Sequence, residues 1–289
     1  METIFITNDL WRARTAEKAG VDRIMVDLEI LGKVERQGHL NTVISRHSLA
    51  DVESLRAALT TSALMVRVNP IHASSDGEIS AIIAAGAEIV MLPMFTYPKE
   101  VADFVDMVRG RAKTCLLFET GAALANIHEV LQVDGIDEAH IGLNDLHLSL
   151  GLKCMFEPLT DGLVDYMAAI FRERGLRFGI GGVARLGKGS IPADLILSEH
   201  VRLGSSRVIL SRDYCKIFDD SPREDAPSAF QREMGKLREH VERLHRLSRL
   251  DLTTNSEDIK KAVARVVAER LSTASTQPCP TWLHVEQRV

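Results

Sequence analysis

The sequence has no excess of charge of either sign. Its 289 residues include 35 Lys and Arg against 40 Asp and Glu, which gives a formal net charge of −5. Such a balance produces no broad positive field that would gather nucleic acid or anionic lipid. Nucleic acid and membrane surfaces are therefore not expected partners, and small anionic substrates must be bound by local groups.

Long hydrophobic runs are also missing. No stretch approaches the roughly 20 apolar residues that a membrane-spanning helix needs. The first eight residues, METIFITN, show no basic segment followed by an apolar stretch and a cleavage site. We therefore expect a soluble, cytoplasmic protein.

Cysteine is scarce and scattered. The four cysteines, at positions 115, 154, 215 and 279, form no C-x-x-C pair, so the sequence gives no basis for a zinc site or a disulfide framework. Cys115 lies in an apolar run, where a buried free thiol behaves as a small hydrophobic side chain.

Short β-rich runs alternate with longer segments of helical spacing, a pattern typical of parallel strands joined by helices. The eight candidate strands begin at Ile4, Arg23, Leu64, Ile89, Thr114, His140, Arg177 and Arg207. Eight units predict a (β/α)8 TIM barrel. An open doubly wound sheet shows the same alternation, but it usually has a glycine-rich turn after the first strand. Here the turn after Ile6 reads Thr-Asn-Asp-Leu-Trp, without glycine.

The alternation stops after Asp213, and we expect a C-terminal helical extension on the barrel. We assign residues 1–218 to the catalytic barrel, 219–271 to helices and 272–289 to a flexible tail. A linker is expected over residues 221–227, and a second helix from about Asn255 to Leu271. One apolar stripe recurs at steps of three and four residues, comprising Phe230, Met234, Leu237, Val241, Leu244 and Leu247. It must pack on its own barrel or on a partner subunit; we expect a homo-oligomer formed through these helices.

Two carboxylates follow apolar strands one β/α unit apart. Glu119 comes after Leu116-Leu-Phe, and Asp145 comes after His140-Ile-Gly-Leu-Asn. Since barrel chemistry lies at the carboxyl ends of the strands, both should face one pocket. Hard cations such as Mg²⁺ are often held by one or two carboxylates, with water and substrate oxygens completing the site. The alternative is a pair of solvated carboxylates at helix N-termini.

Two further features suggest anion binding. Arg67 ends an apolar strand, where it would either bind a substrate carboxylate or pair with a neighbouring barrel carboxylate. After the seventh strand, Gly179-Ile-Gly-Gly-Val-Ala-Arg-Leu-Gly-Lys-Gly would either cradle an anion, with Arg185 and Lys188, or provide unusual backbone angles.

At these residues the chain resembles the metal-dependent (class II) 2-oxo-acid aldolases and the citrate lyase β-subunit superfamily, over about residues 22–210. The most specific match is Ile141-Gly-Leu-Asn-Asp-Leu-His-Leu-Ser-Leu-Gly, joined by Phe118-Glu-Thr and Val90-Met-Leu-Pro-Met. The resemblance implies that Glu119 and Asp145 ligate Mg²⁺ or Mn²⁺. It also implies that Arg67 binds the oxo-acid carboxylate or its enolate oxygen. We assign Asn69, Leu143 and Asn144, beside these positions, to substrate binding.

The sequence departs from the aldolase branch at the expected base. Aldolases of this type carry Asp-Gly-Glu-His after the second strand, whereas this chain has Asp27-Leu-Glu29-Ile30. That stretch and Val66-Arg-Val-Asn69 are more similar to the citrate lyase branch. His47 is our first substitute for the base and Glu29 the second. The alternative for His47 is a capping or surface histidine.

The resulting hypothesis is a metal-dependent carbon–carbon lyase acting on a 2-oxo acid and an aldehyde, with a pyruvate-type enolate. A Schiff-base mechanism is disfavoured because Lys33 and Lys188 fall in loops and no predicted strand carries a central lysine. Two rivals stay open: an acyl-CoA lyase acting on a thioester, and a barrel without catalysis that serves as a binding or assembly subunit. Acceptor selectivity is expected to lie in loops such as residues 31–46.

Overall fold

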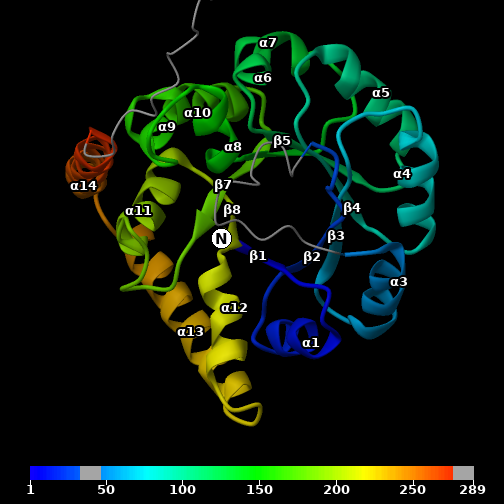
Figure 1. Cartoon of the computed structure of the whole chain (residues 1–289), viewed down its shortest axis with the longest axis horizontal. Helices are drawn as coiled ribbons and strands as arrows, with labels where there is room; N and C mark the ends of the chain where they lie inside the picture. Colours follow the sequence, from blue (N-terminus) through cyan, green and yellow to red (C-terminus); the bar gives the residue numbers. More distant parts are fainter. Residues whose placement is uncertain (33–46, 276–289) are drawn as a thin grey trace, which may run out of the picture.

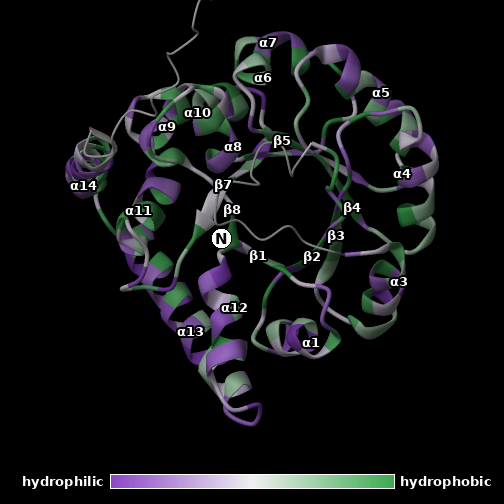
Figure 2. Cartoon of the chain, in the orientation of Figure 1, coloured by the Kyte–Doolittle hydropathy of each residue, from purple (hydrophilic) through white to green (hydrophobic). Residues whose placement is uncertain are grey.

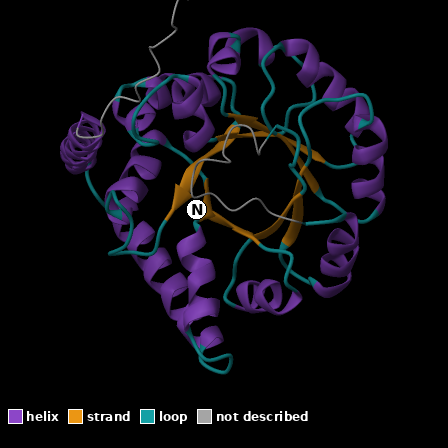
Figure 3. Ribbon diagram, viewed as in Figure 1, coloured by secondary structure: helices purple, strands orange, loops and turns teal. Residues whose placement is uncertain are grey.

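The computed structural model describes residues 1–32 and 47–275. Eight parallel strands close into a barrel in sequence order, with helices around the outside (Figures 1 and 3). The predicted (β/α)8 TIM barrel with C-terminal helices is confirmed. The strands are β1 (Glu2–Ile6), β2 (Arg23–Asp27), β3 (Ala63–Arg67), β4 (Ile89–Leu92), β5 (Lys113–Phe118), β6 (Glu138–Ile141), β7 (Arg177–Val183) and β8 (Arg207–Leu210).

The described helices lie around the outside of the barrel, and the last of them follow its eighth strand in the sequence. They are α1 (Leu10–Lys18), α3 (Leu49–Ala58), α4 (Ser75–Ala84), α5 (Pro98–Val108), α6 (Gly121–Ala125), α7 (Ile127–Val130), α8 (Leu143–Ser149), α9 (Glu157–Thr160), α10 (Leu163–Glu173), α11 (Ala193–Leu203), α12 (Arg212–Asp220), α13 (Ala226–His245) and α14 (Arg249–Ser275). In Figure 2 these helices carry both hydrophobic and hydrophilic residues, as expected when one face covers a barrel. No helix within the described ranges is long and apolar enough to cross a membrane.

Glycines end several helices where the next strand approaches. Gly20 follows α1 with φ 80°, and Gly86 follows α4 with φ 100°. Side chains other than glycine are disfavoured at such angles, so these positions stop the helix and redirect the chain.

The predicted strands are observed, with differences of two or more residues at the ends of three of them. β1 begins at Glu2, two residues before Ile4. β6 begins at Glu138, two residues before His140, because the buried carboxylate is neutralised by arginines rather than exposed to water. β7 runs on through Gly181 and Gly182 to Val183, where its register with β8 shifts. A bulge of this kind lets the strand bend at the barrel mouth.

The inside of the barrel is filled by apolar side chains in its middle. The interior cluster consists of Ile4, Met25, Met65, Ile89, Met91, Cys115 and Leu117. Alternate residues point outward and join the larger core beneath the helices. Cys115 is a free, buried thiol as predicted.

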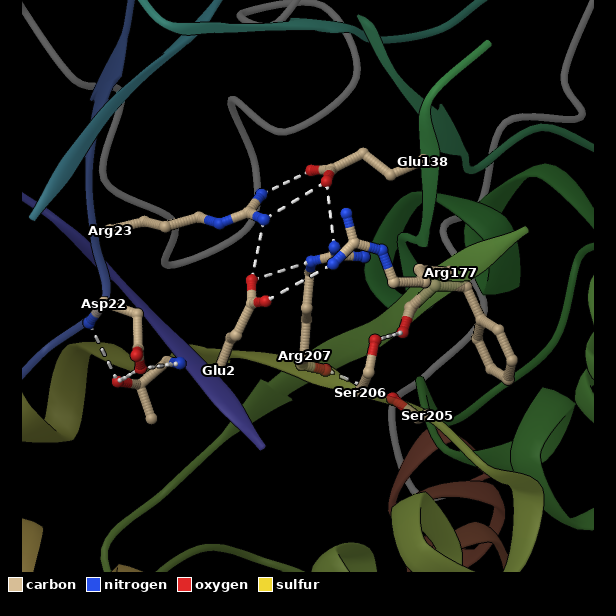
Figure 4. A network of polar contacts seen from close by, with 10 residues as sticks. Glu2, Asp22, Arg23, Glu138, Arg177, Ser205, Ser206 and Arg207 are labelled. Carbon is tan, nitrogen blue, oxygen red and sulfur yellow. Dashed lines mark hydrogen bonds and ion pairs between the residues drawn. The ribbon is translucent and has the colours of Figure 1, made fainter. Parts of the chain in front are cut away.

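A network of buried ion pairs closes the end of the barrel where the strands begin (Figure 4). Glu2 Oε2 accepts from Arg23 Nη2 at 2.7 Å and from Arg207 Nε at 3.0 Å. Both arginines also pair with Glu138. Two guanidinium groups thus face two carboxylates, which balances the charge of groups that would be costly to bury singly. The opposite end is left for chemistry.

The apolar stripe of the C-terminal extension packs on the chain's own barrel. Its residues from Phe230 to Leu244 are buried, and the Phe230 ring lies 5.3 Å from the Phe5 ring and 5.1 Å from the Phe218 ring. The stripe thus covers its own barrel, which is the first of the two alternatives, and the expectation that it contacts a partner subunit is wrong. The stripe offers no open seam to a partner, so any oligomer must use another surface.

The last helix begins six residues before the predicted start at Asn255. Ser248 Oγ accepts a hydrogen bond from the Asp251 N–H at 3.1 Å, and Asp251 Oδ2 accepts one from the Ser248 N–H at 3.2 Å. This reciprocal cap fixes the start at Arg249, while Asn255 instead donates to Ser198 Oγ at 2.9 Å. α14 packs along α11. It extends to Ser275, beyond the predicted end at Leu271 and into the predicted tail, whose residues 276–289 lie outside the described ranges.

Candidate active site

The predicted site residues gather where the strands end. Asp27 ends β2, Arg67 ends β3, Glu119 follows β5 and Asp145 lies in the first turn of α8, after β6. Because all strands are parallel, these ends meet at one mouth of the barrel. Glu119 and Asp27 are both buried, whereas Asp145 is half-buried.

Arg67 forms an ion pair inside the barrel. Its Nε and Nη2 atoms each lie 2.9 Å from one oxygen of Asp27, and Nε lies 3.4 Å from Glu29 Oε2. Burial alone would lower the pKa of Arg67, but these carboxylates raise it above its usual value, so the guanidinium stays charged.

This ion pair leaves part of Arg67 available. Asp27 occupies the edge formed by Nε and Nη2, and within the described part of the chain Nη1 donates no hydrogen bond. A guanidinium presents a second edge, Nη1 with Nη2, that can receive another carboxylate in the paired, planar geometry. Arg67 can therefore hold Asp27 and a ligand carboxylate together.

Glu119 is positioned by its neighbours in two ways. Met94, which has a left-handed φ of 55°, donates its backbone N–H to Glu119 Oε1 at 3.1 Å. On the other side, a Cβ on Gly142 would lie 2.8 Å from both Cβ and Oε2 of Glu119. Glycine is thus required at position 142 for the close approach of β6 to this carboxylate.

The electrostatics of Glu119 suit a cation site. Burial raises its pKa well above the ordinary value; Arg67 opposes this, while Asp145 and Glu29 raise the pKa further by repulsion. Among the described residues, Arg67 is thus the group whose charge lowers the pKa of Glu119, while two other carboxylates raise it. A divalent cation between Glu119 and Asp145 would relieve this repulsion.

The donor set also limits what kind of metal site is possible. Over residues 1–32 and 47–275, no group of three or more His, Cys, Asp or Glu is arranged to hold a metal ion. A tetrahedral zinc site is therefore not formed by these residues. Two carboxylates, with the other positions left to water and substrate oxygens, fit a hard cation such as Mg²⁺ or Mn²⁺.

His47 is brought to the end of β2, next to Asp27. Its Nδ1 accepts the Asp27 backbone N–H at 3.0 Å. The neutral ring therefore carries its proton on Nε2 and can present that N–H as a donor. The cap of α3 is Ser48, whose hydroxyl and backbone N–H pair with Asp51; the capping alternative for His47 is thus not what the structure has.

Two of the three further residues assigned to substrate binding have other surroundings. Asn69 Oδ1 accepts the N–H groups of Ile30 and Leu31 at 2.8 and 3.0 Å, so both of its lone pairs are used within the protein. The Leu143 side chain is buried beneath Gly181. The third residue, Asn144, is half-buried, and its side chain makes no hydrogen bond to another described residue.

The glycine-rich segment after β7 supports the second of its two interpretations. Gly181, Gly187 and Gly189 have φ values of 37°, 76° and 96°, which other residues rarely adopt. Arg185 Nε donates to Asp213 Oδ2 at 2.8 Å. Lys188 is exposed. Arg185 is therefore engaged in an ion pair rather than aimed into an anion cradle.

Comparison with known proteins shows the family of the chain. A model of the family described as HpcH/HpaI aldolase/citrate lyase matches residues 8–157, just over half of the chain. A hydroxypyruvate/pyruvate aldolase from Rhizorhabdus wittichii is 44% identical over 78 residues, which cover 24% of this chain. The match spans only 31% of that aldolase's length.

Solved structures share the fold at low sequence identity. An HpcH/HpaI aldolase from Desulfitobacterium hafniense has a TM-score of 0.57 at 15% identity, over 73% of this chain and 85% of its own. A protein of the aldolase/citrate lyase family from Burkholderia cenocepacia scores 0.59 at 16% identity, over 79% and 94%. The citrate synthase SbnG scores 0.57 at 18% identity, over 81% and 94%. At these identities the likeness shows the fold alone.

Proposed function

Because the chain belongs to the HpcH/HpaI aldolase/citrate lyase family, we propose that it is a metal-dependent carbon–carbon lyase. It makes or breaks a bond between a 2-oxo acid enolate of the pyruvate type and an aldehyde. The observation that carries this proposal is the meeting of Glu119, Asp145 and the open edge of Arg67 at one barrel mouth. The curated relative named hydroxypyruvate/pyruvate aldolase supports the choice of substrate class.

Glu119 and Asp145 are the residues that would hold Mg²⁺ or Mn²⁺. When bound, the cation supplies a Lewis acid that favours the enolate form of the oxo acid. Met94 keeps Glu119 Oε1 in place through its backbone N–H, and Gly142 leaves room for the other oxygen. Glu119 thus needs little rearrangement to bind a cation.

Arg67 orients the oxo acid. Asp27 fixes the guanidinium through Nε and Nη2, so the second edge points in a constant direction and receives the substrate carboxylate. In the cleavage direction, a base must take the proton from the substrate hydroxyl as the carbon–carbon bond breaks. Glu29 is buried beside Arg67 and is suited to accept that proton, while His47, whose Nδ1 accepts the Asp27 N–H, would present its Nε2–H as a hydrogen-bond donor. Placing Glu29 before His47 as the base reverses the order we expected from the sequence.

Proton exchange tests this function without knowledge of the aldehyde. In D₂O with Mg²⁺ or Mn²⁺, the protein should exchange the methyl protons of pyruvate, which NMR detects as loss of the methyl signal. Exchange on acetyl-CoA but not on pyruvate would favour the acyl-CoA lyase. Exchange on neither substrate would contradict both enzymes and leave the binding or assembly subunit.

We still propose a homo-oligomer, but one that forms through a different surface from the α13 stripe. Since the α13 stripe is buried, the exposed side chains of α14, such as Leu250 and Leu271, are the apolar residues the C-terminal helices offer a partner. Light scattering should give a mass above 32.0 kDa for the parent, and Leu250→Lys with Leu271→Lys should lower it. A parent at the monomer mass would contradict the prediction.

A further inference from the structure

Thr120 directly follows Glu119, the carboxylate placed in the candidate metal site, and its side chain is buried. Its hydroxyl takes part in two hydrogen bonds. It accepts the Ala123 N–H at 2.9 Å, which caps α6. It also donates to the carbonyl oxygen of Phe95 at 2.9 Å, in the loop after β4. Because β4 lies beside β5 in the barrel, this second bond ties the loop after one strand to the loop after the next.

The loop after β4 reaches back to Glu119 through the residue next to Phe95. Met94 donates its backbone N–H to Glu119 Oε1 at 3.1 Å. Two neighbouring residues of this loop thus bond to Glu119 and to Thr120, the first through the carboxylate and the second through the hydroxyl. The peptide group between them carries the Phe95 N–H, so its two flanking groups are both held by the segment after β5.

Met94 needs such restraint because its backbone conformation is disfavoured. Its φ of 55° lies in the left-handed region, which residues other than glycine rarely adopt. A conformation of this kind persists only where its surroundings hold it. If the Phe95 carbonyl oxygen lost its buried donor, the loop would turn to find another, and Met94 would relax to a favoured φ. Its N–H would then no longer point at Glu119 Oε1.

The rest of the loop is anchored independently of Thr120. The Phe95 ring is buried, and its centroid lies 5.0 Å from that of the Phe118 ring in an edge-on contact. Glu100 Oε2 accepts both the backbone N–H and the hydroxyl of Thr96, each at 2.7 Å. Loss of the Thr120 hydroxyl should therefore displace part of the loop without unfolding the rest.

We propose that Thr120 is a positioning residue of the metal site, which holds Glu119 in place through Phe95 and Met94. This inference rests on the proposed metal-dependent function. It also gives a physical role to the last residue of the motif over residues 118–120. Without the hydroxyl, Glu119 Oε1 loses its fixed donor and the carboxylate can rotate. Cation binding must then order the carboxylate again, which weakens the affinity.

Mn²⁺ affinity and stability, measured on the same variants, test the proposal. Electron paramagnetic resonance gives the Mn²⁺ affinity, and urea unfolding gives the midpoint of the transition. Thr120→Val removes the hydroxyl with little change of shape and should bind Mn²⁺ about ten-fold more weakly, the effect of one buried hydrogen bond. Thr120→Ser keeps the hydroxyl and should bind Mn²⁺ within about three-fold of the parent.

Thr114→Val is the matched control, at the other end of β5. The Thr114 side chain is also buried, and its hydroxyl likewise donates to a carbonyl oxygen, that of Gly135 at 2.6 Å. It also accepts a backbone N–H, that of Asp137 at 3.0 Å. Both threonine-to-valine variants should lower the urea midpoint, but Thr114→Val should leave the Mn²⁺ affinity unchanged.

Equal Mn²⁺ affinity of the control and of folded Thr120→Val overturns the inference and leaves Thr120 as a helix cap. If Thr120→Val does not fold, Asn126→Ala takes its place, because Asn126 Nδ2 donates to the Thr96 carbonyl oxygen of the same loop at 2.9 Å. Asn126→Ala should weaken Mn²⁺ binding in the same direction, and an unchanged affinity there would equally overturn the inference. A parent that binds no Mn²⁺ would instead remove the proposed metal-dependent function.

Discussion

Arg67 and Asp27 form a two-point ion pair, with Nε and Nη2 each 2.9 Å from a different carboxylate oxygen. Lysine keeps the charge but offers a single ammonium, so it cannot hold Asp27 and a ligand carboxylate in two planar pairs. We predict that Arg67→Lys weakens pyruvate binding in the presence of Mg²⁺ by at least about ten-fold, which corresponds to about 1.4 kcal/mol. Isothermal titration calorimetry measures this directly.

The control for that experiment is Arg109→Lys. Arg109 pairs with Asp76 on the surface, where both side chains are more than half exposed, and such pairs contribute little. If Arg67→Lys binds pyruvate as tightly as the control, the ion pair with Asp27 is the whole role of Arg67.

Gly142 should be needed for the position of Glu119. In Gly142→Ala, the new Cβ would lie 2.8 Å from Glu119 Cβ and Oε2, so the carboxylate must move. Although both carboxylates remain, we predict that this variant binds Mn²⁺ at least about ten-fold more weakly. Electron paramagnetic resonance measures the Mn²⁺ affinity. Gly77→Ala, where a Cβ meets nothing within 4 Å, is the control. Equal Mn²⁺ affinity in the two variants would show that Glu119 is not a ligand in this geometry.

His140 should make the fold sensitive to acid. Burial lowers its pKa to about 4, against an unfolded value near 6.5, so the folded state disfavours the charged ring. The unfolded chain then binds more protons between pH 6.5 and 4, and stability falls as the pH drops through that window. The contribution is about 3 kcal/mol, because each pH unit between these two pKa values corresponds to about 1.4 kcal/mol.

Urea unfolding at pH 6.5 and 4.5 measures this loss of stability. His140→Gln should reduce the loss, while His128→Gln, at an exposed histidine, should not. His200, whose pKa burial lowers to about 3, should retain part of the acid sensitivity. An identical loss in parent and His140→Gln would contradict the prediction.

The C-terminal helix α13 should be part of the folding core rather than an appendage. Phe230 is fully buried against Phe5 and Phe218, so Phe230→Ala should cost about 3–5 kcal/mol of unfolding free energy. Glu224→Ala, at an exposed residue in the turn before α13, should change it by less than about 0.5 kcal/mol. Similar stability of the two variants would mean that α13 detaches from the barrel.

Much of the barrel follows from local sequence. Strands such as Arg23–Asp27 and Ile89–Leu92 are short apolar runs bounded by turns, and glycines such as Gly20 end the preceding helix. Such patterns depend on neighbours in the chain and can be recognised without the fold. Glu138 could not be placed in a strand this way, because its burial depends on Arg23 and Arg207, each more than 60 residues away in sequence.

The site was predictable only in part for the same reason. Strand ends placed Glu119 and Asp145, but the partner of Arg67 and the direction of its open edge depend on β2 lying beside β3. The role of Asn69 as an anchor for Ile30 and Leu31 has no sequence signal, since it joins loops about 39 residues apart. Periodicity also could not decide whether the apolar stripe packs on its own barrel or on a partner subunit, because it does not say which surface a helix covers.

Metal binding by Glu119 and Asp145 is the central claim, and one set of measurements tests it most directly. Glu119→Gln and Asp145→Asn keep shape and hydrogen-bonding ability but remove the charges that a hard cation needs. Pyruvate proton exchange and Mn²⁺ binding are measured together on chelator-treated parent and on both variants. The account predicts that Mg²⁺ or Mn²⁺ restores exchange to the parent, while both variants lose metal binding and exchange together. Full exchange by either variant, or by metal-free parent, would contradict it.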